Sequence, residues 1–156
     1  MTIDKKTPRG THGAGNGFAM WLAKVLRRRM IRIHKRSGDT FQGMTLLYLT
    51  TVGAKSGIER EIPLAYFQDP EDDNAWLIVA SLGGAANNPA WYHNIAANPD
   101  RVRIQVNGQG HRVVAEQLEG ERRARAWRQI TADQQRYADY QEKTDRQIPV
   151  LRLTPA

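Results

Sequence analysis

The 156-residue sequence contains no cysteine, so disulfide bonds and thiolate metal sites are excluded. Its four histidines are scattered, with no pair at the spacing of metal ligands, and we expect no metal site. No stretch approaches the roughly 18 consecutive apolar residues that can span a bilayer. The first 16 residues also lack the apolar core of a signal peptide. These absences together predict a cytoplasmic protein.

The positive charge of the sequence is concentrated near the N-terminus. Residues 1–45 contain ten lysines and arginines against two acids, whereas the remaining 111 residues hold 13 bases and 14 acids. Residues 17–36 combine this charge with an apolar stripe and predict an amphipathic helix. Such a helix either packs on the domain or lies on an anionic membrane surface, and the sequence leaves both interpretations open. We expect no nucleic-acid partner, because no second basic surface supports one.

The domain organisation follows from length and composition. The polar, glycine-rich residues 1–16 predict a disordered tail, and residues 17–43 the basic helix and a loop. Residues 44–156 are long enough for one domain with its own core. The oligomeric state stays open.

One stretch, residues 46–64, organises this domain. Its apolar and β-branched run from Leu46 to Val52 predicts a buried strand. A turn bracketed by Gly53 and Gly57 leads to a second strand over residues 60–67. Lys55 in this turn and Arg60 beyond it are either ordinary surface charge or a site for an anion such as a phosphate.

The rest of the chain predicts more strands, with helices in the connections. Asn88 is the predicted N-cap of a helix that ends near Ala97, and a second helix is expected over residues 119–130. Tyr137 and Tyr140 fall in a predicted linker. Further strands are expected over residues 75–81, 101–106, 111–118 and 148–153, the middle pair joined by Asn107-Gly108-Gln109-Gly110. The pattern indicates an α+β, mainly β protein built on a small, partly closed antiparallel barrel.

The sequence contains none of the common motifs by which an enzyme's own side chains carry out catalysis. There is no nucleophile elbow, no zinc-protease motif and no phosphate-binding Walker loop. Ser81, Trp91, Tyr92 and Asn94 are placed where they can line a cleft beside the Lys55 turn. Cations, amides and aromatic rings bind ligands well but perform little acid–base chemistry, so a bound cofactor is the expected source of reactivity.

Three blocks of residues resemble the deazaflavin-dependent nitroreductase family. The first is Leu-Leu-x-Leu-Thr-Thr-x-Gly-x-Lys-Ser-Gly-x-x-Arg-x-x-Pro-Leu over residues 46–64. The second spans residues 79–99 and includes Val-Ala-Ser-x-Gly-Gly-Ala and Trp-Tyr-x-Asn, and the third spans residues 137–149. The resemblance implies a split β-barrel of the flavin-reductase and pyridoxamine-phosphate-oxidase type. It also implies hydride transfer from the deazaflavin coenzyme F420 to quinones, nitroaromatic compounds or similar acceptors.

The resemblance also assigns residues to the coenzyme. Its phosphate and polyglutamate tail would meet Ala54, Lys55, Ser56 and Arg60. Its ring would lie along Glu61, Ile62, Pro63, Leu64 and Ala65. The floor of the site would be Val79, Ala80, Ser81 and Leu82, and its helical wall Ala90, Trp91, Tyr92, His93 and Asn94. Tyr137 and Tyr140 would close over the ring, and with Ser81 they are the expected catalytic residues.

Three positions depart from the family pattern. Ala54 stands where an arginine is common, Leu82 where some members have a lysine, and Gln134 where nitro-drug-reducing members have a tyrosine. The first two departures imply a weaker grip on the coenzyme tail, and the third favours quinone reduction over nitroimidazole reduction. The alternatives are an FMN-dependent reductase of the same barrel type, and a carrier that holds a cofactor or lipid without catalysis.

Overall fold

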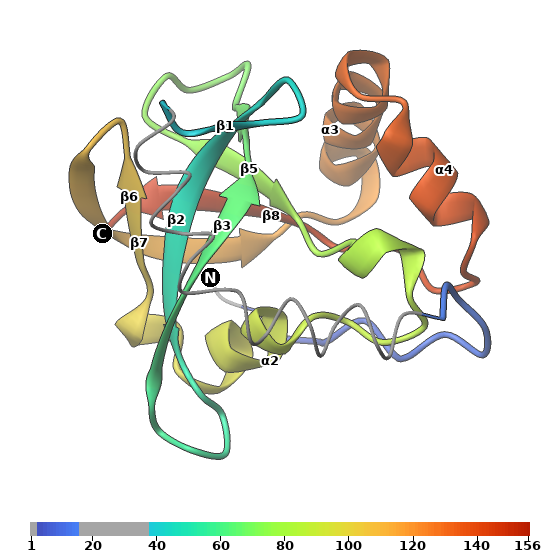
Figure 1. The fold of residues 1–156 in the computed structure, drawn as a ribbon. Coiled ribbons are helices and arrows are strands. Elements are labelled where there is room, and N and C mark those ends of the chain that lie inside the picture. The colour runs from blue at the N-terminus through green and yellow to red at the C-terminus, as the bar shows by residue number, and fades with distance from the viewer. Residues whose placement is uncertain (1–2, 16–37) are drawn as a thin grey trace.

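The computed structural model describes residues 3–15 and 38–156 (Figure 1). The predicted basic helix over residues 17–36 lies outside these residues. Within the described ranges, no helix is long and apolar enough to cross a membrane, and no group of three histidine or acidic side chains is placed to hold a metal ion.

The described chain forms strands with helices between them, as predicted. The strands are β1 (Thr40–Phe41), β2 (Met44–Val52), β3 (Glu59–Ala65), β4 (Phe67–Gln68), β5 (Trp76–Val79), β6 (Arg103–Val106), β7 (Gln109–Gln117) and β8 (Val150–Pro155). The α-helices are α2 (Ala90–Ala97), α3 (Gly120–Asp133) and α4 (Arg136–Glu142), and the short 3-10 helices are η1 (Leu82–Gly84) and η2 (Pro99–Arg101).

All pairings in the sheet are antiparallel, and the sheet curls on itself (Figure 1). The strand order is β1-β2-β6-β7-β8-β5-β4, and β3 pairs with β2. Only Tyr66 separates β3 from β4, and the chain changes neighbour there, from β2 to β5. The predicted single strand over residues 60–67 is therefore two strands, which lets the sheet bend into a partly closed barrel.

The β6–β7 hairpin shows how local sequence sets the register. Asn107 and Gly108 have positive φ angles of 49° and 76°. Glycine and asparagine tolerate this conformation, and a two-residue turn of this kind matches the twist of paired strands. Gln109 and Gly110, predicted as part of the turn, instead begin β7 and pair with β6.

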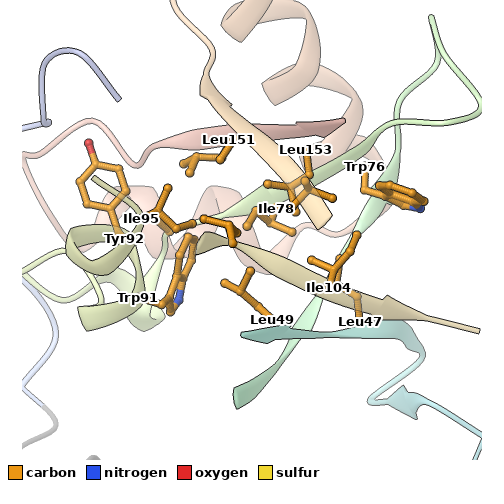
Figure 2. Close-up of a cluster of buried hydrophobic side chains, with 14 of the residues drawn as sticks. Leu47, Leu49, Trp76, Ile78, Trp91, Tyr92, Ile95, Ile104, Leu151 and Leu153 are labelled. Atoms are coloured by element: carbon orange, nitrogen blue, oxygen red, sulfur yellow. The ribbon is translucent and has the colours of Figure 1, made fainter. Parts of the chain in front are cut away.

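The main core lies between the curled sheet and α2 (Figure 2). The strands contribute alternate apolar side chains, and α2 contributes Trp91, Tyr92 and Ile95. A second cluster fills the space between the sheet and the helices α3 and α4, with Ile130 and Tyr137 from those helices. Full burial of one such side chain stabilises the fold by about 1.5–3 kcal/mol.

Residues 3–15 run along the surface of the body, where the sequence predicts a disordered tail (Figure 1). Ile3 is buried in the main core. The amides of Gly10 and Ala14 donate hydrogen bonds to the carbonyls of Ala86 and Gly84, at 2.9 and 3.0 Å. We call residues 3–15 the N-terminal strap. The strap forms no helix or strand of its own, and hydrogen bonds to the body hold it in place.

Two further local predictions differ from the structure. Asn88 does not cap α2: its amide donates to the Thr7 carbonyl at 2.8 Å, and the helix begins after Pro89. Tyr137 and Tyr140 lie in α4 rather than in a linker, because this short helix is held by packing on Phe67 and η1 that the local sequence does not reveal.

Candidate functional site

A cavity of about 940 Å³ opens between the β2–β3 turn, β3, the segment after β5 and the start of α2. This volume lies within the range of cofactor and substrate sites. Fourteen of the predicted site residues line it: Ala54, Lys55, Ser56, Arg60, Ile62, Pro63, Leu64, Val79, Ser81, Leu82, Ala90, Trp91, His93 and Asn94.

Backbone hydrogen bonds define the β2–β3 turn. The Gly53 amide donates to the Ile58 carbonyl, and the Gly57 amide to the Gly53 carbonyl, both at 2.9 Å. Gly57 has a φ of 68°, a conformation that glycine adopts at little cost. The turn therefore projects Lys55 and Ser56 along one edge of the cavity.

Asn94 of α2 holds this turn in place. Its Oδ1 accepts the Ala54 amide at 3.0 Å, and its Nδ2 donates to Thr51 Oγ1 at 3.1 Å. Asn98, just after the helix, donates to the Val52 carbonyl at 3.2 Å. Asn94 is buried, so both of its polar ends are satisfied by β2 and the turn. Its role in the structure is to join α2 to the turn.

The cations at this end of the cavity are available to a ligand. Lys55 is exposed and Arg60 is half-buried. Among the described residues, neither side chain makes an ion pair with an acidic group. Two unpaired cations beside a turn favour an anionic group such as a phosphate or carboxylate.

The rest of the cavity is mostly apolar. Ile62, Pro63 and Leu64 of β3 form one side, and the other sides include Val79, Leu82 and Trp91. Trp91 is 7% exposed and also packs in the main core, so its ring position is fixed (Figure 2). A flat apolar ligand fits such a wall, with its charged part at the Lys55 end.

His93 and Ser81 add polar side chains to this lining. Burial lowers the pKa of the His93 imidazole, and the charge of Lys6 lowers it further. His93 is therefore neutral at pH 7. Ser81 ends the segment after β5 and places a hydroxyl at the cavity, where it can donate or accept a hydrogen bond.

Four residues predicted for the coenzyme do not line the cavity. Glu61 and Ala65 belong to β3, but they are absent from its cavity face. Ala80 is fully buried, and its amide donates to the Pro149 carbonyl at 2.9 Å. The fully buried Tyr92 donates its hydroxyl to Gln117 Oε1 at 2.5 Å and accepts the Thr7 amide at 2.9 Å. Neighbours along a strand or helix point in different directions, and the resemblance alone does not separate them.

Tyr137 and Tyr140 are also not among the described residues that line this cavity. Tyr137 is 6% exposed, with its ring edge-on to Phe67 at 5.6 Å. Burial, with the neighbouring Tyr140, raises the pKa of its hydroxyl to about 12. Tyr140 packs edge-on against it at 5.7 Å, and the Lys143 ammonium lies 5.6 Å from the Tyr140 ring centre. Their contact with an acceptor stays a prediction.

Three lining residues were not predicted for the site: Thr51, Gly53 and Pro89. Thr51 is the last but one residue of β2, Gly53 follows the strand and opens the turn, and Pro89 precedes α2. All three lie inside the blocks that carry the family resemblance. Their closeness in sequence to the predicted site residues Ala54 and Ala90 was the one signal that could have identified them.

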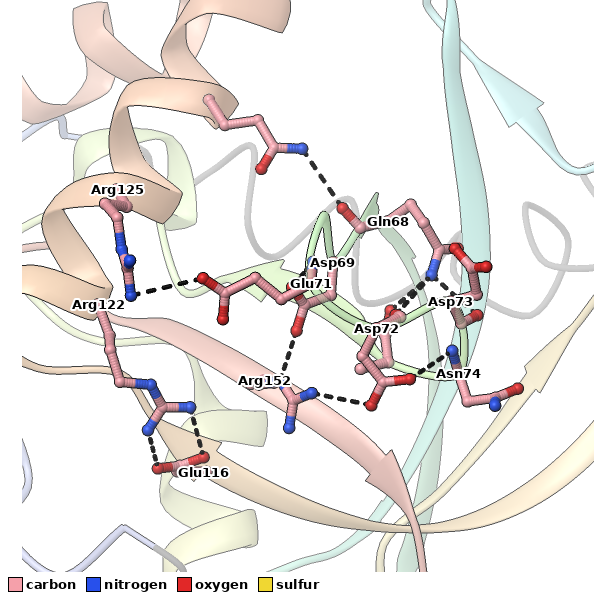
Figure 3. Close-up of polar contacts among 12 residues, drawn as sticks. Gln68, Asp69, Glu71, Asp72, Asp73, Asn74, Glu116, Arg122, Arg125 and Arg152 are labelled. Atoms are coloured by element: carbon pink, nitrogen blue, oxygen red, sulfur yellow. Dashed lines mark hydrogen bonds and ion pairs between the residues drawn. The ribbon is translucent and has the colours of Figure 1, made fainter.

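A smaller cavity of about 110 Å³ is surrounded by charges that neutralise each other (Figure 3). Arg152 donates to Asp69 Oδ2 at 2.5 Å and to Asp72 Oδ2 at 2.9 Å, and these bonds raise its pKa. Nearby, Arg122 pairs with Glu116 at 2.6 Å. Because its cations already have partners, this cavity is a poorer anion site than the one beside Lys55.

Comparisons with known proteins agree with this arrangement. The family model of the F420H(2)-dependent quinone reductases matches residues 23–155. An F420H(2)-dependent quinone reductase of Mycobacterium tuberculosis strain H37Rv is 36% identical over 149 residues, which cover 88% of this chain and 97% of the relative.

Solved structures extend the comparison to the fold. A structure of an F420-H2 dependent reductase (FDR-A) is 38% identical, with a TM-score of 0.60 over 69% of this chain and 92% of that one. The heme storage protein HutZ of Vibrio cholerae, 15% identical, has a TM-score of 0.54 over 82% of this chain and 89% of its own, and shows likeness of fold alone. The predicted split β-barrel is confirmed. By both sequence and fold, the chain belongs to the F420H(2)-dependent quinone reductase family.

Proposed function

We propose that this protein binds coenzyme F420 in the 940 Å³ cavity and reduces a quinone with it. One observation carries the proposal: a mostly apolar wall lies in the same cavity as two cations, Lys55 and Arg60, that form no ion pair with an acidic side chain of the described residues. Family membership supports the identity of the coenzyme and of the acceptor class.

The donor set fits this coenzyme. Lys55 and Arg60 suit the phosphate and acidic tail, with the polar turn residues beside them. Pro63 and Leu64 of β3 and Trp91 of α2 suit the planar ring, since an apolar wall gives contact area without competing hydrogen bonds. When bound, the reduced coenzyme supplies a hydride.

The protein's own contribution is to bind, orient and exclude water. Fixed walls hold the reactants close together, which lowers the entropic part of the barrier. The Ser81 hydroxyl lines the cavity, and we assign to it a hydrogen bond to the acceptor oxygen that gains negative charge. Neutral His93 adds a polar group to the wall without repelling cations or attracting anions.

The basic segment over residues 17–36 suggests how the acceptor is reached. Seven of the chain's 23 lysines and arginines lie in this segment, which contains no acidic residue. Each basic residue at an anionic membrane contributes about 1 kcal/mol, and in this proposal the segment brings the cavity to lipid-soluble quinones. Sedimentation with anionic but not neutral vesicles, weakened by salt, is expected. Equal sedimentation with both, or with neither, would exclude the membrane contact.

The reductase proposal is tested by mixing the purified protein with reduced coenzyme F420 and menadione. We expect coenzyme oxidation well above the rate without protein, with no requirement for FMN. A requirement for FMN would identify an FMN-dependent reductase of the same barrel type. Tight coenzyme binding without oxidation would identify a carrier. A parallel assay with a nitroaromatic acceptor tests whether that class is also reduced, and Ser81→Ala should slow the quinone reaction while leaving coenzyme affinity nearly unchanged.

A further inference from the structure

Arg146 is a buried cation with an unusual set of partners. Its side chain is 3% exposed, and its guanidinium donates four hydrogen bonds. Nε reaches the Ala85 carbonyl at 2.8 Å, and Nη2 the Ser81 carbonyl at 2.7 Å. Nη1 reaches the Ala80 carbonyl at 3.1 Å and Asn88 Oδ1 at 2.8 Å. Every acceptor is neutral, and every one lies between residues 80 and 88.

No acidic side chain among the described residues forms an ion pair with Arg146. The adjacent Asp145 instead accepts hydrogen bonds from Thr11 of the N-terminal strap. Burying a charge without a counter-ion is costly unless its hydrogen bonds are satisfied, and a rigid guanidinium fork satisfies several at once. A neutral side chain would avoid this cost but could not donate all four hydrogen bonds. The role that these bonds indicate for the guanidinium is to hold residues 80–88 in place.

Residues 80–88 contain a strained backbone turn at the cavity. Leu82, Gly83 and Gly84 have successive φ angles of 45°, 63° and 84°. Glycine adopts positive φ freely, but leucine rarely does, and its conformation persists only where the surroundings hold it. Arg146 bonds the carbonyls on either side of this turn, at Ser81 and Ala85.

We infer that Arg146 is a positioning residue for the cavity: it holds Ser81 and Leu82 in the lining without lining the cavity itself. Coenzyme affinity then depends on a side chain that does not touch the coenzyme. This inference rests on the proposed function, because it requires that the cavity bind coenzyme F420. Its geometric part concerns the protein without ligand and is testable separately.

The test compares Arg146→Lys with Arg123→Lys. Lysine keeps the charge but lacks the planar fork, so it cannot bond both ends of the turn. Arg123 is the matched control, because its partly buried guanidinium donates to the Ile148 carbonyl at 2.7 Å and it does not line the cavity. In fluorescence titrations with oxidised coenzyme F420, we expect Arg146→Lys to weaken binding at least about tenfold and Arg123→Lys less than about twofold.

Hydrogen exchange gives a readout that needs no ligand. The Gly84 amide donates to the Ser81 carbonyl at 2.9 Å, and the Ala85 amide to the Leu82 carbonyl at 3.1 Å. In ligand-free Arg146→Lys both amides should exchange at least about tenfold faster than in the parent, and in Arg123→Lys they should be unchanged. Parent-like affinity or parent-like exchange in Arg146→Lys would overturn the inference.

A milder variant covers the case in which Arg146→Lys does not fold. Asn88→Ala removes one of the four acceptors, together with the hydrogen bond to Thr7. We expect a several-fold loss of affinity and faster exchange at Gly84 and Ala85, and unchanged values of either would overturn the inference. If the parent itself does not bind coenzyme F420, the proposed function fails, and the exchange experiment still decides whether Arg146 holds the turn.

Discussion

Replacing the two cavity cations should weaken coenzyme binding unequally. Arg60 is half-buried on β3, whereas Lys55 is exposed at the tip of its turn. A hydrogen bond to a charged group contributes about 1.5–3 kcal/mol where water is partly excluded, but an exposed ion pair contributes only about 0–1 kcal/mol. We therefore expect Arg60→Ala to raise the dissociation constant about ten- to a hundredfold, and Lys55→Ala less than about fivefold.

The assay is a titration of oxidised coenzyme F420 at low and high ionic strength. Salt should weaken binding by the parent, and it should weaken binding by the alanine variants less, because one screened charge has already been removed. Arg128→Ala is the matched control: it removes the same charge from α3, at an exposed position outside the cavity lining. Its affinity should stay within about twofold of the parent.

Two results would refute this reasoning. Parent-like affinity of both cavity variants at low salt would mean that the anionic tail does not bind beside the β2–β3 turn. Equal losses in all three variants would mean that only the net charge matters.

Three further predictions concern Asn94, Gly84 and Asp145, which hold the turns and the N-terminal strap in place. Asn94→Ala removes two hydrogen bonds that join α2 to β2 and its turn, so urea denaturation should show a loss of about 2 kcal/mol in the free energy of unfolding. An unchanged free energy of unfolding would contradict this role of Asn94. Gly84→Ala should lower the melting temperature, because a Cβ there would lie 2.5 Å from the Tyr140 carbonyl oxygen at a φ of 84°, whereas Gly110→Ala meets open space and should not. Hydrogen bonds from Thr11 lower the pKa of Asp145 from 3.8 to about 2, so the carboxylate stabilises the docked strap above pH 3.8 and loses this effect as the pH falls towards 2. The NMR chemical shift of the Thr11 amide should follow this protonation, and the absence of a transition in that pH range would contradict the prediction.

Local sequence signals predicted much of the barrel. The strand over residues 46–52, its turn and the Asn107-Gly108 hairpin depend on neighbouring residues, and the structure confirms them. The division of the second strand at Tyr66 was not predicted, because it reflects two different neighbours, β2 and β5. Such choices are made by tertiary pairing, which local propensity does not encode.

The cavity was predicted mainly through the family resemblance. That resemblance names segments, and the structure separates the side chains that face the cavity, such as Ile62 and His93, from those that face the core, such as Ala80 and Tyr92. The positioning groups were harder to foresee. Arg146 lies 58 to 66 positions from its acceptors, and nothing in its local sequence shows that it is buried.

The N-terminal strap has a consequence for the order of events during synthesis on the ribosome. Thr11 and Asp145, which hold the strap to the body, are separated by 134 positions in the chain. The strap is therefore synthesised well before the residue that holds it. Gly84 and Ala86, to which the strap also bonds, are made in between, and Arg146, which holds the turn at residues 82–84, follows directly after Asp145. Docking of the strap and completion of the cavity should therefore both wait until residues 145 and 146 have left the ribosome, and they should occur together.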